Sequence, residues 1–210
     1  MNDLGANGTL APPHEAKVPF ASFCRGPCET RGVSCCVALL RGINLGPANK
    51  VDMAELRTVF TALGHQEVST YIRSGNVVFR SDRADLDEIA RESQARIERD
   101  LGVTSAVIVR SHSDLEAVLR ANPFMYDEHD PAKLHVAFLG KEPAPDVVDA
   151  LNVPSGESAR FAVVGREMYL HYPNGSARTK LGTSFLARLG VVATARNWRT
   201  VHKLHALTAD

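Results

Sequence analysis

The chain has 210 residues, of which 44% are hydrophobic, so it can bury an ordinary core as one medium domain or as two small domains packed together. Its 24 Lys and Arg residues balance its 24 Asp and Glu residues, which excludes a net field that would draw the protein to nucleic acid or to an anionic membrane. No apolar run approaches the roughly 20 residues of a transmembrane helix, and residues 1–34 lack the pattern of a signal peptide. We therefore expect a cytoplasmic protein with no membrane partner.

Four cysteines, Cys24, Cys28, Cys35 and Cys36, lie in the first fifth of the chain, where disulfides would constrain little of the fold. In a reducing compartment they are expected to remain thiols. Four cysteines could also bind zinc. Cys35 and Cys36 are adjacent, however, and adjacent side chains of a strand point to opposite faces and cannot easily share one metal. We therefore expect no metal site.

Residues 1–34 combine glycines and prolines with scattered polar residues and have no helical or strand period. A segment of this composition cannot offset its own ordering entropy, so we expect a disordered N-terminal extension.

The next part of the chain, residues 35–112, has the element order strand, helix, strand, strand, helix, strand. Hydrophobic periodicity and capping residues place a strand at 35–40, a helix between Asp52 and Gly64, a hairpin at 67–79, a helix at 85–101 and a strand at 105–110. This order is the split βαβ, or ferredoxin-like, arrangement of an α+β fold.

The second part, residues 113–210, nearly repeats this order and predicts a second subdomain. Its expected elements are a short helix at 114–120, a strand at 134–139, a helix at 145–151, a hairpin with strands at 161–164 and 168–171, a helix marked by Leu181, Phe185 and Leu189, and a final helix at 197–207.

The loop after the first strand carries Arg41, Asn44, Asn49 and Lys50. Glycines in such a loop allow the backbone to approach a ligand closely. The spacing is not that of a Walker A motif, because no Ser or Thr follows Lys50 and because Asp52 already caps the next helix. The alternative is a turn whose asparagines only satisfy backbone groups. Both interpretations remain open at this stage.

Arg73, Ser74 and Asn76 lie at the turn of the first predicted hairpin. Ser-Gly-Asn is common turn chemistry, so a purely structural role is the simpler interpretation. Ser74 is poorly supported as a nucleophile, because the sequence offers it neither a G-x-S-x-G frame nor a suggested His and Asp partner.

Two C-terminal segments indicate an anion. Lys180 is expected in the first turn of a helix, where the macrodipole disfavours a cation unless an anion binds there; the alternative is a side chain that bends into water. Arg196 is expected to join Arg199 and Lys203 in a basic stripe along the final helix, with Trp198 facing the core. The alternative for the stripe is an ordinary solvated face.

Four polar segments occur in the order LLRGINLG at 39–46, NK-x-x-M at 49–53, TYIRSGNVVF at 70–79 and TARNWRTVHKL at 194–204. As a set they resemble the bacterial family catalogued as domain of unknown function 1697, from Cys35 to the C-terminus. The resemblance implies two packed ferredoxin-like subdomains with a C-terminal helix. It implies no established activity.

The leading hypothesis is that these segments converge on one groove between the subdomains and bind a small phosphate-bearing or other anionic ligand. Catalysis, cofactor and oligomeric state are left open. A nucleic-acid-binding module is one alternative, because ferredoxin-like sheets include RNA-recognition domains. A scaffold with Arg41, Arg73 and Arg196 on separate faces is another. The candidate ligand-binding residues are Arg41, Asn44, Asn49, Lys50, Arg73, Ser74, Asn76, Lys180, Arg196 and Asn197.

Overall fold

The computed structural model describes residues 32–46 and 49–209. The expected disordered extension, residues 1–34, lies outside this range except for its last three residues, and Ser34 already opens the first strand. None of the helices within the described range is long and apolar enough to cross a bilayer.

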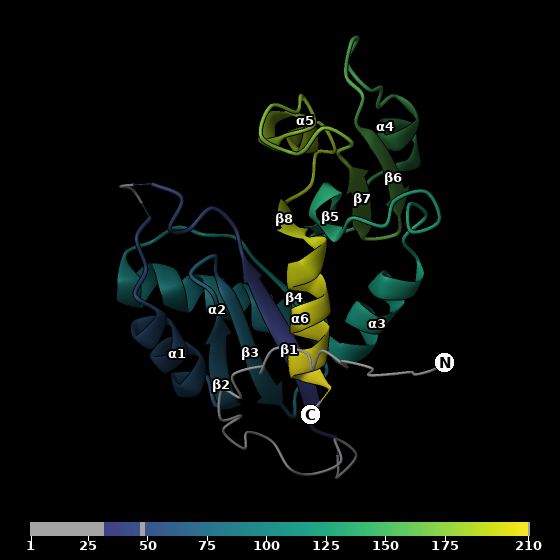
Figure 1. Cartoon of the computed structure of the whole chain (residues 1–210). Coiled ribbons are helices and arrows are strands. Elements are labelled where there is room, and N and C mark those ends of the chain that lie inside the picture. Colours follow the sequence, from purple (N-terminus) through teal and green to yellow (C-terminus); the bar gives the residue numbers. More distant parts are fainter. Residues whose placement is uncertain (1–31, 47–48, 210) are drawn as a thin grey trace, which may run out of the picture.

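The first unit is a four-stranded antiparallel sheet covered on one face by two helices (Figure 1). The strand order is β2-β3-β1-β4, so the first strand lies between the third and the fourth. Its elements are β1 (Ser34–Leu40), α1 (Met53–Ala62), β2 (Gln66–Tyr71), β3 (Asn76–Ser81), α2 (Leu86–Leu101) and β4 (Val107–Ser111).

Both helices of this unit begin and end where the sequence predicts. Asp52 accepts hydrogen bonds from the backbone of the first turn of α1, and Asp85 does the same for α2. Gly102 ends α2 in the left-handed conformation, with φ of 66°, which glycine adopts without strain. The apolar faces of both helices pack on β1 and β3 in one core around Phe60 and Phe79.

The second unit repeats the arrangement with strand order β6-β7-β5-β8. It contains β5 (Leu134–Leu139), α4 (Pro145–Asp149), β6 (Arg160–Val164), β7 (Glu167–His171), α5 (Thr183–Ala187) and β8 (Ala193–Asn197). Its two helices have only five residues each. The two similar sheets confirm the predicted α+β class and the repeated element order.

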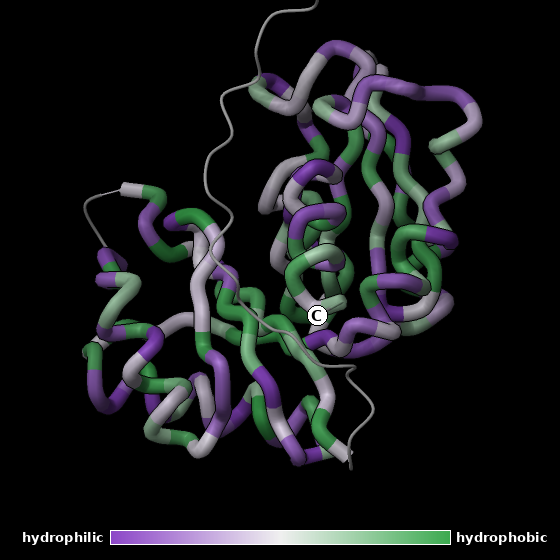
Figure 2. Tube along the Cα trace, turned by 60° about the horizontal axis from the view of Figure 1, so that its bottom comes forward, coloured by the Kyte–Doolittle hydropathy of each residue, from purple (hydrophilic) through white to green (hydrophobic). Residues whose placement is uncertain are grey.

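Two further helices, α3 (His112–Arg120) and α6 (Trp198–Thr208), pack on each other and join the units; a short 3₁₀ helix at Pro131–Lys133 precedes β5. Residues from both sheets and both helices share one buried cluster that includes Val37, Val136, Trp198 and Val201. Figure 2 shows the two lobes, with green, apolar stretches along their strands. As predicted, Trp198 faces the core.

One strand was missed from the sequence. Residues Ala193–Asn197 were not expected to be extended, and Arg196 was placed on a helix, whereas it lies on β8. The predicted basic stripe is therefore wrong: Arg196 is buried on a strand, while Arg199 and Lys203 are exposed on α6. The helical spacing of the three basic residues gave the wrong prediction because a buried arginine on a strand needs hydrogen-bond acceptors from distant parts of the chain. A local sequence pattern does not reveal such acceptors.

Candidate functional site

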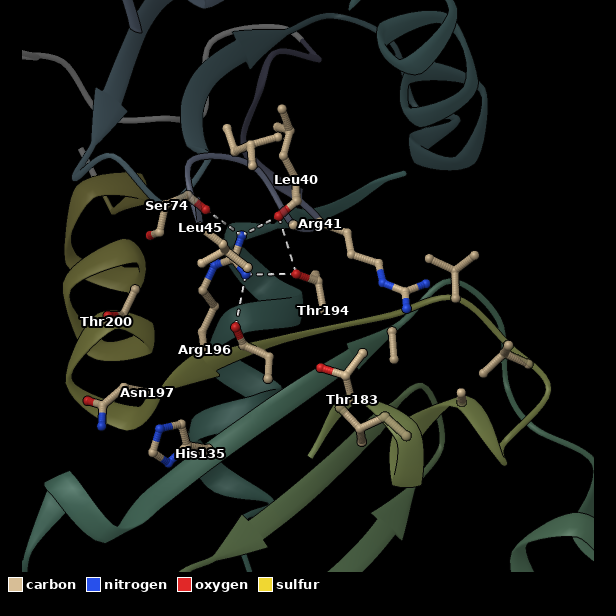
Figure 3. A pocket seen from close by; sticks show the side chains of 18 of the residues that line it. Leu40, Arg41, Leu45, Ser74, His135, Thr183, Thr194, Arg196, Asn197 and Thr200 are labelled. Carbon is tan, nitrogen blue, oxygen red and sulfur yellow. Dashed lines mark hydrogen bonds between the residues drawn. The ribbon is translucent and has the colours of Figure 1, made fainter. Parts of the chain in front are cut away.

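A pocket with a volume of about 770 Å³ lies between the two units (Figure 3). The first unit contributes the end of β1, the following loop and the β2–β3 turn. The second unit contributes β5, α5 and β8, and the start of α6 completes the wall. The polar side chains that line the pocket are Arg41, Ser74, His135, Thr183, Thr194, Arg196, Asn197 and Thr200.

Arg196 lies at the junction of the two units and is only 7% exposed. Its Nε donates to Oδ1 of Asn76 at 2.6 Å, and Nη1 donates to Oγ1 of Thr194 at 2.7 Å and to the carbonyl of Ala195 at 2.9 Å. Nη2 donates to the carbonyl of Leu40 at 2.9 Å and to the two carbonyls of the β2–β3 turn at 3.2 and 3.3 Å. Every N–H group of the guanidinium is therefore engaged.

All of these acceptors are neutral. Among the described residues, no carboxylate forms an ion pair with Arg196. Burial lowers the pKa of Arg196 to about 10, so the side chain stays charged at neutral pH. A buried, uncompensated positive charge consequently lies in the wall of the pocket, where it favours a negative charge nearby.

Another buried arginine at the junction of the units is Arg110 on β4, which is 3% exposed. Its Nε donates to Oε1 of Glu167 at 2.9 Å, and its Nη2 donates to the carbonyl of Leu139 at 2.8 Å. Burial lowers the pKa of Arg110, and the charge of Glu167 opposes this effect. Unlike Arg196, Arg110 has its own counter-ion.

Arg41 supplies a second positive charge. Its side chain is exposed and forms no hydrogen bond or ion pair within the part of the chain that the structure describes. Its backbone is fixed, because its N–H donates to the carbonyl of Ala106 at 2.9 Å and its carbonyl accepts from Ser105 at 2.9 Å. The two guanidinium groups of the pocket point apart (Figure 3), as like charges should. Arg41 therefore has donors available for a ligand.

The start of α6 adds uncharged donors. Asn197 is the N-cap residue, and its Oδ1 accepts the N–H of Arg199 at 2.9 Å. The other N–H groups of a first helical turn have no partner inside the helix, and the macrodipole makes this end partly positive. Thr200, two residues into the same turn, also lines the pocket.

His135 on β5 provides a ring close to Asn197, its antiparallel partner on β8. Burial lowers the pKa of His135, so the ring is neutral at pH 7. The ring packs edge-on against Tyr172, with 5.1 Å between the ring centroids. The charge of the pocket therefore comes from its arginines and not from this histidine.

The structure brings together only some of the predicted residues. Arg41, Ser74, Arg196 and Asn197 line the pocket. Asn76, which is fully buried, acts behind them: its Oδ1 accepts from Arg196, and its Nδ2 donates to Tyr71 and Ser74 at 3.0 Å.

Asn44 has the structural role that was the alternative interpretation of its loop. Its side chain bonds to both backbone groups of Val51 and donates to the carbonyl of Arg73 at 2.9 Å. The remaining predicted residues are exposed and do not line the pocket, namely Asn49, Lys50, Arg73 and Lys180.

The predicted position of Lys180 is wrong. Helix α5 begins at Thr183 with Gly182 as its N-cap, so Lys180 precedes the helix and does not lie in its first turn. Its Nζ donates to the carbonyl of Ser155 at 2.8 Å, and its backbone N–H donates to Glu157. The lysine therefore fixes a loop of the second unit.

Sequence reasoning missed His135, Thr183, Thr194 and Thr200 as pocket residues. Thr194 and Thr200 flank the predicted Arg196 and Asn197, so the segment itself was found although its conformation was not. No local signal distinguishes His135 or Thr183. Within the described ranges, no group of three or more His, Cys, Asp or Glu side chains could hold a metal ion; Cys24 and Cys28 lie outside those ranges.

The family model described as "Protein of unknown function (DUF1697)" matches residues 33–169, which is more than half of the chain. The protein therefore belongs to this family, as its motifs predicted. The fold is similar to that of the conserved bacterial protein SP0830 from Streptococcus pneumoniae, with a TM-score of 0.64 and 25% sequence identity over 84% of this chain and 99% of that one. A comparison with curated proteins found no match.

Proposed function

We propose that the protein binds a small anionic ligand in the pocket between its two units. The observation that carries this proposal is the charge of Arg196, which is buried in the pocket wall without a carboxylate partner among the described residues. Burying a charge without a counter-ion is unfavourable, and an anion in the pocket would relieve that cost.

The donors of the pocket have separate tasks. Because the N–H groups of Arg196 are all engaged, this residue supplies charge and not direct contacts. The guanidinium of Arg41 and the O–H groups of Ser74 and Thr200 are available to donate to the anion, while the oxygen of Ser74 accepts from Asn76. The N-terminal end of α6 adds backbone donors. Binding is the proposed activity, and no residue of the pocket is assigned as a general base.

The strand order of each unit, with its first strand between the third and the fourth, supports the ferredoxin-like interpretation. An RNA-recognition mode is less well supported. Such domains stack bases on an open sheet face, whereas α1 and α2 pack on one face of the first sheet and α3 and α6 on the other. We also expect the protein to act in the cytoplasm.

The proposal can be tested by titrating the protein with inorganic phosphate, pyrophosphate and short carboxylates in a calorimeter. Arg41→Ala should weaken anion binding about tenfold, which is the loss of one charge-assisted contact. Arg73→Ala is the matched control, since this exposed arginine of the neighbouring turn does not line the pocket. Equal losses in both variants, or no anion binding by the wild-type protein, would reject the proposal.

A second variant addresses the buried charge. Asn76→Asp places a carboxylate beside the Nε of Arg196, as Glu167 does for Arg110. With the charge of Arg196 neutralised, the pocket should then bind an external anion about tenfold more weakly. The variant also loses the amide donor to Tyr71, so its unfolding without ligand must be measured alongside. A correctly folded Asn76→Asp protein with unchanged affinity would show that Arg196 plays no electrostatic part in binding.

A further inference from the structure

The chemistry of the pocket wall narrows the class of ligand further. We infer, on the basis of the proposed function, that the ligand is a soluble amphiphilic anion with one anionic head group and an aliphatic body, and that it binds without a divalent cation. The head group is a phosphate monoester or a carboxylate.

The first observation is an imbalance of charge. Two arginines line the pocket, and none of its described lining residues is Asp or Glu. A nucleotide that binds as a magnesium complex usually requires a carboxylate for the metal. With none in the wall, a divalent cation would meet only positive charge and neutral dipoles. An anion that binds directly to arginine and hydroxyl groups fits this wall better.

The second observation concerns exposed apolar side chains. Leu45 is 82% exposed and Val192 is 40% exposed, and both line this pocket, one from each unit. Leu186, Ala187 and Val191 extend the apolar surface on the side of the second unit. Solvent-exposed leucine and valine at the edge of a pocket gain free energy when a ligand covers them. The wall therefore suits a ligand with a substantial apolar part.

The third observation is the scarcity of aromatic rings. His135 is the one ring side chain among the described residues that line the pocket, and it forms a T-shaped contact with Tyr172. Proteins that hold nucleobases commonly stack them on aromatic side chains. An aliphatic body, which needs only apolar contact, matches the alanine, valine and leucine side chains present. The volume of about 770 Å³ is in the range of pockets for small molecules.

The inference can be tested with a homologous series of inorganic phosphate and methyl, butyl and hexyl phosphate, titrated into the full-length protein by calorimetry. Each additional methylene group that the pocket covers should tighten binding about threefold, or about 30-fold from methyl to butyl phosphate. Affinities should be the same in EDTA and in excess Mg²⁺. Adenosine monophosphate should bind no better than butyl phosphate.

Variants of the apolar wall provide the internal control. Leu45→Ser and Val192→Ser should each reduce the ratio of the hexyl phosphate affinity to the phosphate affinity by about threefold or more. Val164→Ser removes a similarly exposed valine, at 45%, that does not line the pocket, and should leave this ratio at the wild-type value.

The outcomes separate this inference from the proposed function. If phosphate binds but the alkyl series is flat, the aliphatic class is wrong while the anion site stands. If binding disappears in EDTA, the metal-free part is wrong. Binding only to vesicles that contain phosphatidic acid would show a lipid surface and overturn a soluble ligand. If neither this phosphate series nor the short carboxylates of the first titration bind, both proposals fail.

Discussion

Arg110 and Arg196 occupy equivalent places in the two units. Each is the fourth residue of the last strand of its unit, and each precedes the residue that caps the next helix. Each guanidinium crosses to the other unit and donates to the carbonyl at the end of its first strand, that of Leu139 at 2.8 Å or that of Leu40 at 2.9 Å. The two units are therefore joined by two equivalent hydrogen bonds from a buried arginine to a backbone carbonyl.

The two ends of this junction differ in one polar partner. Glu167 opens β7 and accepts from Arg110, whereas the equivalent residue of β3 is Asn76, which accepts from Arg196. A carboxylate neutralises one arginine, and an amide leaves the other charged. The first end is a closed structural joint, and the second retains charge that a ligand can use.

The cavity beside Arg110 is smaller than the pocket beside Arg196. At the closed end, the side chain of Arg166 lies across the joint and donates to Asp87 at 2.8 Å. The cavity that Arg110, Arg166 and Glu167 line there has a volume of about 230 Å³. At the open end the equivalent residue is Gly75, whose carbonyl accepts from Leu40 as that of Arg166 accepts from Leu139. Gly75 has no side chain that could lie across the open end as that of Arg166 does, and the place of its missing Cβ is occupied by Ile43 and Leu40. The two equivalent joints thus differ: one is closed by its own carboxylate, and the other, which we propose as the anion site, adjoins the larger pocket.

The largest expected effect comes from removing the arginine of the open end. Arg196→Met should lower the free energy of unfolding by about 3 to 5 kcal/mol, because several buried acceptors, including Leu40 and Asn76, lose their donors at once. Urea denaturation measures this change. Arg199→Met, on the exposed face of α6, should stay within about 0.5 kcal/mol of wild type. A loss below about 1 kcal/mol for Arg196→Met would mean that the open end contributes little to holding the units together.

The turns of the two hairpins offer the next comparison. In Gly75→Ala, the new Cβ would lie 2.8 Å from Cδ1 of Ile43 and from Cβ of Leu40, at a residue whose φ is 78°. Steric overlap and a left-handed alanine together should cost about 2 to 4 kcal/mol. Gly165→Ala has a positive φ of 57° but no atom near its Cβ, so it should cost only about 1 kcal/mol. Equal thermal shifts for the two variants would contradict the close packing at Gly75.

The repeated fold could be predicted from the sequence, because its helices carry local capping signals such as Asp52 and Gly102, and its central strands are short apolar runs. Strand β8 could not be predicted from the sequence. Arg196 is stabilised there by carbonyls that lie 120 or more residues earlier in the chain, and no local pattern encodes acceptors at that distance. The same reason explains why Arg196 was placed on an exposed helix face.

Only some residues of the candidate site could be predicted from the sequence, because a local pattern does not show which way a loop side chain faces. Polar residues near Gly and Asn mark loops, and this signal located Arg41 and Ser74, which line the pocket. The signal does not distinguish a loop residue that faces a pocket from one that fastens the loop. Asn44 and Lys180 both belong to the second kind, since their side chains bond to backbone carbonyls. Only the three-dimensional arrangement separates the two groups.

A smaller effect should follow from making the closed end resemble the open one. Glu167→Gln keeps an acceptor for Arg110 but removes its charge, so the free energy of unfolding should fall by about 1 kcal/mol, the difference between a charged and a neutral hydrogen bond. Glu116→Gln, which breaks an exposed pair with Arg120 on α3, should cost less than about 0.5 kcal/mol. If both variants unfold at the same denaturant concentration as the wild-type protein, the charge of Glu167 does not stabilise the closed end.

The smallest effect concerns pH and the ring that only the open end contains. His135 lies where the first unit has Cys36, and burial lowers the pKa of His135 below its ordinary value of 6.5. The unfolded chain therefore binds a proton more readily than the folded one. The stability from a neutral His135 is complete above pH 6.5 and is lost as the pH falls from there through the pKa of the folded state.

His65 and His205 also have pKa values lowered mainly by burial, so the pH dependence of the wild-type protein alone cannot assign the loss of stability to His135. In His135→Gln the other two remain, and the decrease in the free energy of unfolding between about pH 7.5 and about pH 5.5 should become smaller than in wild type. An unchanged decrease would mean that water reaches the ring of His135 in the folded protein.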